Sequence, residues 1–271
     1  MNNSKNKILI VGAGNMGTTY AESFLLSHSI TKDDLLILEK TTEKADFLRE
    51  KGYKYVISTP DKKVSEVQLI ILAVKPQDTQ ILFKTLKDYI LPSQTVLSIM
   101  AGVKIKTLQN SLGTTKIIRA MPNLPSQIGM GMTGFTADES VTRDELFFVQ
   151  NLLNTTGKSL YFSEEEKIDA VTAISGSGPA YVYFFMEAMI KEAQKMGFSH
   201  SEAELLVTQT FMGAAHLENK SNYSCEEWIK RVSSKGGTTK AALNVFSEQK
   251  IADKIGKGLE AAQKRAKELG E

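Results

Sequence analysis

Three glycines near the start of the chain have the spacing of a dinucleotide-binding turn. The segment Gly12-Ala-Gly-Asn-Met-Gly17 carries the pattern G-x-G-x-x-G directly after the apolar run 8–11. In this pattern the first glycine makes a tight turn, the second admits a pyrophosphate, and the third lets a helix pack closely on a strand. The phosphates then lie at the N-terminus of the following helix. We therefore predict dinucleotide binding by Gly12, Gly14, Asn15, Met16 and Gly17.

An acidic residue and two lysines follow where such folds hold the adenosine ribose. Glu39 lies 22 residues after Gly17, at the end of an apolar run. Its carboxylate could accept a hydrogen bond from a ribose 2′-hydroxyl, which favours NAD, and it would repel the 2′-phosphate of NADP. Lys40 and Lys44 could offset that repulsion and hold a phosphate. The three residues could equally form a solvated turn and helix start, so the choice between NAD and NADP stays open.

Two further segments are predicted to line the same cofactor. Ala73-Val-Lys-Pro76 and Ala101-Gly102 each follow an apolar run. In open α/β sheets the carboxyl ends of the strands meet at the ligand-binding edge, and Met121-Pro-Asn-Leu-Pro125 lies at the same edge. Pro76 restricts Lys75 to extended geometry, although it could also serve only as the first residue of a helix. The predicted cofactor contacts here are Ala73, Val74, Lys75, Pro76, Ala101 and Gly102.

A second glycine-rich turn, Ser233-Ser-Lys-Gly-Gly-Thr-Thr-Lys240, lies far along the chain. Gly236 and Gly237 allow a tight turn, and the amides from Thr238 onward open a helix whose positive dipole end attracts an anion. The turn lacks the spacing of a nucleotide-phosphate loop, and the cofactor phosphates already have a site at the first turn. We expect it to bind a small carboxylate.

No residue stands out as a proton donor. The three histidines, His28, His200 and His216, are best interpreted as structural or solvated, and Tyr181 and Tyr183 lie within an apolar run. Carbonyl reductases usually need such a donor, whereas an iminium substrate already carries its proton and needs only hydride and positioning. A single cysteine and the scattered histidines form no cluster at zinc-ligand spacing, so we predict no metal site.

The chemistry-bearing segments sit between elements of two kinds. Short runs rich in Val, Ile and Leu predict strands at 7–11, 35–38, 68–74, 95–99 and 116–121, and amphipathic segments predict helices at 15–27, 42–51 and 77–89. Strand and helix in alternation predict a mostly parallel sheet covered on both faces. The predicted fold class is α/β, with a Rossmann-type dinucleotide-binding domain over residues 1–162.

The strand signal stops after about residue 163. Candidate capping boxes at Ser163 to Glu166 and at Ser224 to Glu227 each open a segment of helical period. The sequence predicts an all-helical dimerisation and substrate domain over residues 163–271, with helices at about 166–174, 178–196, 200–219, 225–232, 238–247 and 250–269.

The helix containing Tyr181 to Ile190 is apolar nearly all round in its first turns. Such a helix is either the centre of its domain or a subunit interface. Small residues in Phe211-Met-Gly-Ala-Ala215 would let another helix approach closely. We therefore favour an obligate homodimer, because about 108 residues of helices this apolar bury themselves best against a twin.

Composition narrows the kind of partner. The 271 residues carry a formal net charge of +2, so no surplus of positive charge indicates nucleic acid or anionic lipid. The start of the chain lacks the pattern of a signal peptide, and the longest apolar stretch, 180–190, is too short to span a bilayer. With its lone cysteine, the chain is expected to be cytoplasmic, with a small-molecule substrate.

Six blocks in order carry a resemblance to a known family: GAGNMG at 12–17, AVKPQ at 73–77, SIMAGV at 98–103, IIRAMPNLP at 117–125, SGSGPAYVYFFMEAM at 175–189 and VSSKGGTTKAAL at 232–243. Along nearly its whole length the chain resembles pyrroline-5-carboxylate reductase, the last enzyme of proline biosynthesis. The resemblance implies reduction of the C=N bond of 1-pyrroline-5-carboxylate to L-proline with NADPH or NADH.

The family also implies an assembly and a set of site residues. Its members form interlocked dimers that often assemble into decamers, with the active site between the nucleotide domain and the helical dimer region. Transferred to this chain, Thr239 would hydrogen-bond the ring nitrogen as the catalytic residue. The substrate would be held by Ser175, Ser233, Gly236, Gly237, Thr238 and Thr239.

The chain departs from the family pattern at three places. It has Lys235 where a proline is usual, Leu124-Pro-Ser126 where Thr-Pro-Ala is common, and Glu39 where NADP-preferring members carry small polar residues and a basic one. Lys235 could attract the substrate carboxylate or simply face solvent.

Two other functions agree with parts of the sequence but not with all of it. A β-hydroxyacid dehydrogenase usually needs a catalytic lysine in the helical domain, and no lysine stands on an apolar face there. A dinucleotide-sensing dimer would have little use for the SGSGP and KGGTT blocks.

Overall fold

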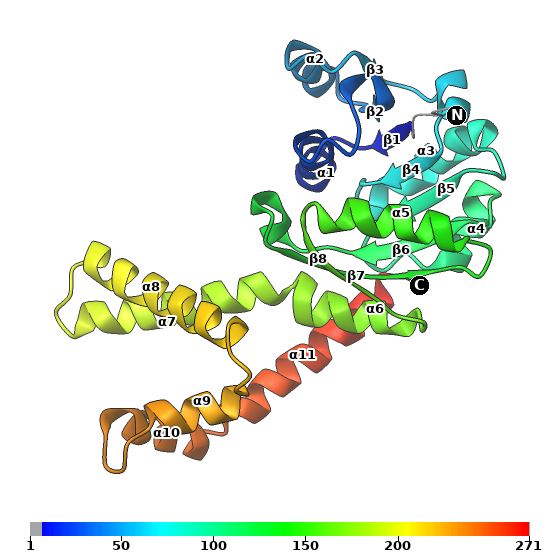
Figure 1. Ribbon diagram of the computed structural model, residues 1–271. Coiled ribbons are helices and arrows are strands. Elements are labelled where there is room, and N and C mark those ends of the chain that lie inside the picture. The colour runs from blue at the N-terminus through cyan, green and yellow to red at the C-terminus, as the bar shows by residue number, and fades with distance from the viewer. Residues whose placement is uncertain (1–6, 271) are drawn as a thin grey trace. The chain divides into compact units, whose positions relative to one another are not determined.

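The computed structural model describes residues 7–270 (Figure 1). By its internal contacts the chain divides into two compact units, the first comprising Met1–Ser177 with Ala262–Glu271 and the second Gly178–Ala261. Each unit has its own set of buried residues.

The first unit is built on one eight-stranded sheet with the order β3-β2-β1-β4-β5-β6-β7-β8. The first six strands pair in parallel, β7 runs antiparallel to β6, and β8 runs parallel to β7. The strands are β1 (Ile8–Val11), β2 (Leu35–Leu38), β3 (Tyr55–Ile57), β4 (Leu69–Leu72), β5 (Thr95–Ser98), β6 (Ile117–Met121), β7 (Gly131–Ala137) and β8 (Gly157–Tyr161). The strand order reverses between β1 and β4, which is where such sheets bind ligands.

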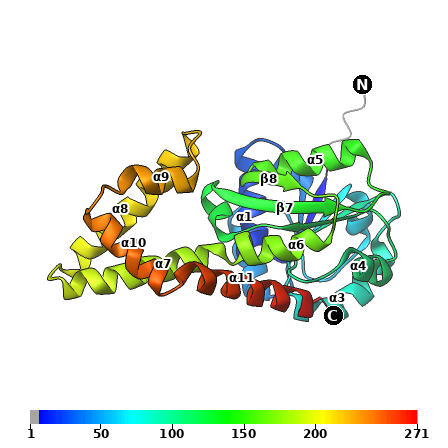
Figure 2. The same ribbon diagram turned by 90° about the horizontal axis from the view of Figure 1, so that it is seen from below.

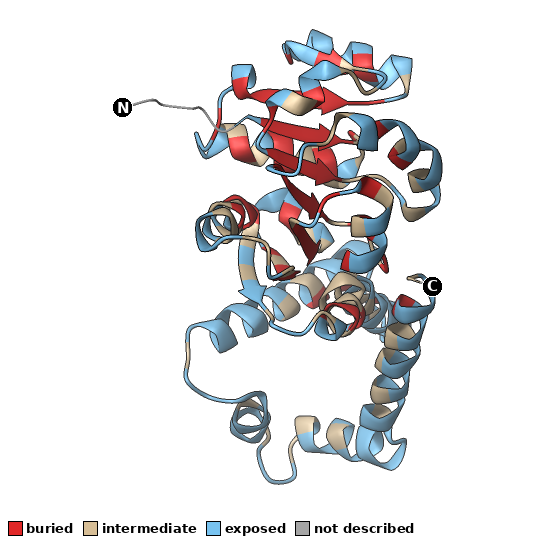
Figure 3. Cartoon of the chain, turned by 90° about the vertical axis from the view of Figure 1, so that its right-hand side faces the viewer, coloured by how far each residue is buried: buried red, intermediate tan, exposed pale blue. Residues whose placement is uncertain are grey.

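Helices cover both faces of the sheet, as predicted. The helices of this unit are α1 (Asn15–Leu26), α2 (Thr42–Glu50), α3 (Thr79–Leu86), α4 (Ile105–Leu112), α5 (Arg143–Asn154) and α6 (Glu166–Val171). Ile8 and Ile10 of β1 share a core with α1, α2 and α5, whereas Leu9 and Val11 share a core with α3 and α4. Successive strand residues point to opposite faces, so a strand covered on both sides must be apolar throughout. Figure 3 shows these strands as buried.

All five predicted strands form, while β3, β7, β8, α4 and α5 were not predicted. β3 is only three residues long. In β7 two glycines and two threonines hide the strand pattern, yet Thr133 and Thr136 are buried. Gly134 leaves space for helix α6, because a Cβ at that position would lie 2.7 Å from Val171 Cγ2. Tertiary packing therefore decides these elements, which local composition alone does not reveal.

The later helices agree with the predicted bounds to within one or two residues. They are α7 (Gly178–Lys195), α8 (His200–Asn219), α9 (Cys225–Val232), α10 (Thr238–Glu248) and α11 (Ile251–Glu268). The predicted helix 166–174 differs, because α6 ends at Val171 and continues as a π-helical turn, Thr172–Gly176. Figure 2 shows these helices from a second direction.

One of the two predicted capping boxes is confirmed. Ser224 accepts a hydrogen bond from the Glu227 amide, and the Glu227 carboxylate accepts one from the Ser224 amide at 2.7 Å. The box predicted at Ser163 is wrong, because α6 follows Glu165 without a side-chain cap and the Ser163 hydroxyl donates to Glu164 instead. The exposed serine hydroxyl there binds its neighbour's carboxylate rather than a helix amide.

The second unit has a small core and a large exposed apolar surface. Its described buried core consists of Ile190, Ala203 and Val207. On α7, by contrast, Phe184 is 70% exposed and Tyr183 is 58% exposed in the single chain. The apolar helix is therefore not enclosed by its own unit. This excludes the interpretation that the helix is the centre of its domain and leaves the interpretation that it is a subunit interface.

Contacts group α6 with the sheet, whereas the predicted boundary counts α6 with the later helices. That boundary, between residues 162 and 163, stays a prediction.

Candidate active site

The glycine turn between β1 and α1 has the geometry that its pattern predicts. Gly12 has φ +95°, and a Cβ there would lie 2.8 Å from Val74 Cγ1. A Cβ on Gly17 would overlap the carbonyl oxygen of Gly12, whereas the space beside Gly14 is open. The first and third glycines are thus required by backbone conformation and packing. The second leaves room for a ligand to approach the backbone.

The N-terminus of α1 is open to an anion. Its N-cap residue is Gly14, so no side chain caps the amides of the first turn. Asn15 and Met16 are the first two residues of the helix and carry two of these amides. Unpaired amides and the positive end of the helix dipole together favour a phosphate at this position.

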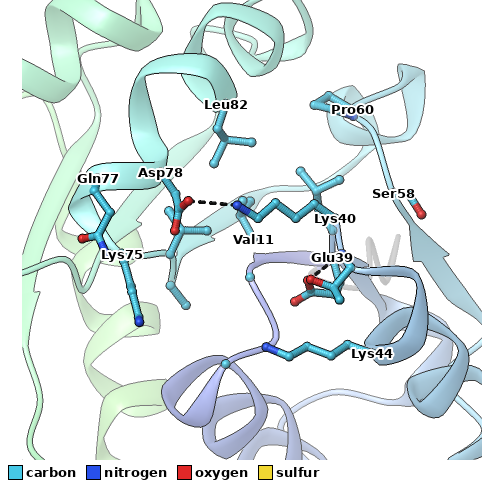
Figure 4. A pocket seen from close by; sticks show the side chains of 16 residues that line it. Val11, Glu39, Lys40, Lys44, Ser58, Pro60, Lys75, Gln77, Asp78 and Leu82 are labelled. Atoms are coloured by element: carbon cyan, nitrogen blue, oxygen red, sulfur yellow. Dashed lines mark hydrogen bonds and ion pairs between the residues drawn. The ribbon is translucent and has the colours of Figure 1, made fainter.

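A cavity of about 360 Å³ lies beside this turn (Figure 4). Seven of the predicted cofactor residues line it: Gly12, Gly14, Glu39, Lys40, Ala73, Val74 and Lys75. They come from the carboxyl ends of β1, β2 and β4, as the sequence predicts. The turn, the open helix end and the cavity therefore fit a dinucleotide.

The other predicted cofactor residues lie outside the lining of this cavity. Gly17 packs beneath the turn, and Pro76 opens a short 3₁₀ turn, Pro76–Asp78. Gly102 has φ +79° and lies against the end of the chain, where a Cβ would come within 2.8 Å of Leu269. The cofactor roles of Asn15, Met16, Gly17, Pro76, Ala101 and Gly102 stay predictions.

The cavity is also lined by residues that the sequence reasoning missed. Ser58 and Pro60 follow β3, Gln77 and Asp78 directly precede α3, and Leu82 lies within α3. Recognising β3 in the sequence would have identified Ser58 and Pro60, because residues that follow a parallel strand lie at the same edge of the sheet.

Glu39 is buried, with 5% of its surface exposed. One carboxylate oxygen accepts the Ala13 amide at 2.9 Å, and the other accepts the Thr41 amide at 2.9 Å. Burial acts to raise the pKa of this carboxyl, but these hydrogen bonds, the Thr41 hydroxyl and the charge of Lys44 outweigh it and hold the pKa below its ordinary value. Glu39 is therefore ionised at neutral pH and bonded to the protein's own backbone.

Lys40 reaches across the cavity to Asp78, with 2.9 Å between the ammonium and a carboxylate oxygen (Figure 4). This hydrogen bond raises the pKa of Lys40 and lowers that of Asp78. Both side chains are substantially exposed, so the pair is a surface ion pair of small energy that a ligand can displace.

The predicted substrate residue Ser175 lies in the π-helical turn. The side-chain amide nitrogen of Asn123 donates to both the carbonyl oxygen and the hydroxyl oxygen of Ser175, each at 3.2 Å. The amide oxygen of Asn123 accepts the Met132 backbone amide at 2.8 Å. Asn123 was not singled out from the sequence, although it lies in the segment 121–125 assigned to this sheet edge.

An ion-pair network holds the helix that leads to Ser175. Arg119 on β6 is 1% exposed and pairs with Glu165 at 3.0 Å and with Asp169 at 2.6 Å. Glu165 also accepts the Ile105 amide at 2.8 Å, at the start of α4. The guanidinium thus ties β6 and α6 together inside the first unit.

The turn predicted to hold a carboxylate lies in the second unit. Gly236 has φ +74°, and α10 begins after the N-cap residue Gly237 without a side-chain cap. A Cβ on Gly237 would overlap the Ser234 hydroxyl oxygen, so a larger residue here would displace that side chain. The Ser233 hydroxyl oxygen is shielded from solvent and has no hydrogen-bond partner within the described part of the chain.

Two absences apply to residues 7–270. These residues include no group of three or more His, Cys, Asp or Glu side chains that could hold a metal ion. None of their helices is long and apolar enough to cross a membrane.

The doubly wound sheet, the glycine turn and the cavity at the strand-order reversal define a dinucleotide-dependent oxidoreductase. Residues 7–102 match the family model for NADP oxidoreductase coenzyme F420-dependent proteins, and residues 165–269 match the model for pyrroline-5-carboxylate reductase dimerisation.

Similar proteins cover the whole chain. The chain is 33% identical to pyrroline-5-carboxylate reductase of Aquifex aeolicus, over 97% of both chains. It is 35% identical to pyrroline-5-carboxylate reductase 2 of Bacillus subtilis, over 98% of this chain and 95% of that one.

Solved structures of pyrroline-5-carboxylate reductases are also similar to this chain over nearly its whole length. The pyrroline-5-carboxylate reductase of Coxiella burnetii is 32% identical, covers 99% of this chain and 100% of its own, and superposes with a TM-score of 0.88. The Plasmodium falciparum enzyme with NADP bound is 27% identical, covers 98% and 99%, and has a TM-score of 0.87.

The chain belongs to the pyrroline-5-carboxylate reductase family. It is an NAD(P)H-dependent enzyme that reduces pyrroline-5-carboxylate to proline. Its helical part is a dimerisation domain, which supports a homodimer.

Proposed function

We propose that the turn 233–240 holds the carboxylate of 1-pyrroline-5-carboxylate while Thr239 contacts the nitrogen of the ring. The observation that carries this proposal is that the turn holds both the uncapped N-terminus of α10 and the shielded hydroxyl of Ser233, which has no partner in the described part of the chain. A polar group shielded from water without a partner costs free energy. A bound carboxylate would supply acceptors for that hydroxyl and for the amides of Thr238 and Thr239.

Among the described helices, α1 and α10 have glycine as the N-cap residue, which supports the assignment of a different anion to each. Gly14 caps α1 and Gly237 caps α10, and neither helix has a side chain bonded to its first-turn amides. At α8 and α9, by contrast, serine and glutamate side chains satisfy these amides through capping boxes. The open ends are suited to two different anions: the cofactor pyrophosphate at α1 and the substrate carboxylate at α10.

The residues that would hold the cofactor are those of the glycine turn and of the cavity lining. When bound, NAD(P)H supplies the hydride that reduces the C=N bond. The P. falciparum relative with NADP bound supports the use of this cofactor class. Among the cavity residues, Gly12 and Gly14 permit close approach, and Lys40 and Lys44 are cations available to the nucleotide.

Thr239 is the second residue of α10 and is half buried. Its hydroxyl orients the ring through the nitrogen, and it need not act as an acid because the iminium form already carries its proton. The role is positional, and a misplacement of about 1 Å can cost on the order of a hundredfold in rate. Hydride transfer requires the reacting atoms to come within roughly 3–3.5 Å, which is why the orientation of the ring affects the rate. Ser175 would contact the substrate as well.

Assembly beyond the dimer is a further part of the proposal. We infer that the dimers can assemble into a decamer, as the family resemblance implies. A cytoplasmic location stays a prediction from composition, which includes a single cysteine, Cys225, that is free and exposed.

The test is to follow the oxidation of NADH and of NADPH separately with 1-pyrroline-5-carboxylate as substrate. We expect proline to form in step with cofactor oxidation. Failure to oxidise either cofactor would contradict the activity, and the ratio of the two kcat/KM values measures the cofactor preference.

Replacing Thr239 tests the role of the turn. We expect Thr239→Ala to lower kcat by roughly a hundredfold, because the ring loses its orienting hydroxyl, while the fold is retained. Ser247→Ala, which removes an exposed hydroxyl at the other end of α10, is the matched control and should behave as the parent enzyme. An unchanged kcat in Thr239→Ala would remove the residue from the mechanism.

A further inference from the structure

The Glu39 carboxylate joins two loops at the carboxyl edge of the sheet. Its oxygens accept one amide from Ala13, inside the glycine turn, and one from Thr41, at the N-cap of α2, both at 2.9 Å. Figure 4 shows the side chain among the residues that line the cofactor cavity.

The glycine turn is held in place by a small number of contacts. The Gly12 amide donates to the Leu38 carbonyl at 2.8 Å, and Gly17 packs directly on the Gly12 carbonyl. Two side chains also bond to the backbone of the turn: the Thr18 hydroxyl, from within α1, donates to the Gly14 carbonyl at 2.9 Å, and the Glu39 carboxylate, from beyond β2, accepts the Ala13 amide at 2.9 Å. Glycine residues restrict the backbone less than other residues do, so these contacts must hold the turn in the conformation that binds a pyrophosphate.

The same geometry leaves Glu39 little capacity to read the ribose. Only 5% of its surface is exposed, and each oxygen already accepts a charge-assisted hydrogen bond from the backbone. The neighbouring Lys44 offsets its charge, which further weakens any repulsion of a 2′-phosphate. Lys40, in contrast, is 75% exposed and extends over the cavity.

We propose that Glu39 is a positioning residue that fixes the glycine turn for the dinucleotide pyrophosphate and does not choose between NADPH and NADH. This differs from the role that its place in the sequence indicates, which is recognition of a ribose 2′-hydroxyl. The inference rests on the cofactor part of the proposed function and is independent of the substrate turn.

The test compares dissociation constants for NADP⁺ and NAD⁺, measured by calorimetry on the full chain. Glu39→Gln removes the charge and one acceptor, while Glu39→Asp keeps the charge but is too short to reach both amides. Because each variant breaks the link, both should bind NADP⁺ and NAD⁺ about tenfold more weakly. The ratio of the two constants should stay within about threefold of the parent ratio.

Kinetics separate this role from general damage. The loss should appear in the KM for the cofactor rather than in kcat or in the KM for 1-pyrroline-5-carboxylate. Glu43→Gln, an exposed glutamate on α2 outside the cavity lining, makes the same charge change and should bind both dinucleotides as the parent does. Thermal unfolding shows whether each variant is folded. If Glu39→Gln does not fold, the dissociation constants of Glu39→Asp test the proposal.

Each other outcome overturns the proposal. A change of more than about threefold in the ratio would show that Glu39 does choose between the cofactors, and a gain of NADP⁺ affinity in Glu39→Gln but not in Glu39→Asp would assign that choice to the charge. Parent-like binding of both dinucleotides by both variants would show that Glu39 positions nothing, with the proposed function intact. If the parent chain itself bound neither dinucleotide, the proposed function would fail together with this inference.

Discussion

At the scale of single residues, Asn123 determines how Ser175 is presented. Its amide nitrogen donates to the Ser175 hydroxyl, so that hydroxyl acts as an acceptor toward Asn123 and keeps its own hydrogen for another partner. A second bond to the Ser175 carbonyl and a third from the Met132 amide orient the Asn123 side chain. The π-helical turn thus offers a hydrogen-bond donor of defined direction, and such turns are frequent at functional sites.

Asn123→Ala should raise the KM for 1-pyrroline-5-carboxylate by about tenfold or more, because the Ser175 hydroxyl loses the partner that orients it. The dissociation constant for the cofactor should change little. Steady-state kinetics with varied substrate measures this effect. Asn219→Ala, at the exposed end of α8, is the control. Parent-like kinetics in Asn123→Ala would mean that Ser175 needs no orientation or does not meet the substrate.

The titration of Glu39 gives a prediction for pH. Its pKa is lowered in the folded chain, so the interactions of the carboxylate are fully present above the ordinary glutamate pKa and are lost as the pH falls through the lowered value. The affinity for NAD⁺ of the parent relative to Glu39→Gln should be constant from about pH 8 to about pH 5 and should converge only below about pH 4. A relative affinity that changes near neutral pH would contradict this assignment.

At the scale of elements, α6 is fastened to β6 through a buried guanidinium. Arg119 is nearly inaccessible to solvent and satisfies its charge with Glu165 and Asp169. Leaving a buried charge without one of its partners is costly, because water cannot replace the lost carboxylate. Because the π-helical turn follows α6 directly, this link also fixes the position of Ser175 relative to β6.

We expect Asp169→Asn to lower the free energy of unfolding by roughly 3–5 kcal/mol, since the Arg119 guanidinium then faces an amide in place of a carboxylate. Chemical denaturation of the parent and the variant measures the change. Asp144→Asn removes an exposed carboxylate from α5 and should be close to neutral. A loss below about 1 kcal/mol in Asp169→Asn would show that the network contributes little.

At the scale of the whole molecule, the exposed apolar side chains of α7 require a partner surface. Val182, Tyr183, Phe184, Phe185 and Met189 are all more than a third exposed in the single chain. Contiguous apolar patches of this kind mark interfaces, and the dimerisation-domain match covers the same helix. A second copy of the chain would bury this face.

Phe184→Glu should convert the dimer to a monomer at micromolar concentration, because a charge would replace an apolar contact inside the interface. Sedimentation equilibrium measures the mass of the assembly. Leu26→Glu makes a similar change at a residue of α1 that is 80% exposed, and it should leave the dimer intact. An unchanged mass for Phe184→Glu would place the interface elsewhere.

The sequence by itself determined the elements that have strong periodicity and the turns that need glycine. The five apolar strands, the helices from 178 onward and the Gly12 to Gly17 turn follow from local pattern, because burial on both faces, helical period and φ > 0 each leave a signature in residue type. Elements whose residues are small or polar, such as β7, lack that signature, so neighbouring segments decide them.

Only the tertiary structure decided what the side chains at these elements contact. Glu39 stands where an acidic residue can bind ribose, yet the Ala13 and Thr41 amides occupy its carboxylate. Lys40 pairs with Asp78, 38 residues further along the chain, and Asn123 meets Ser175 across 52 residues. Residue type sets which bonds a side chain can make, but the partner it finds depends on which distant backbone or side chain the fold brings within about 3 Å.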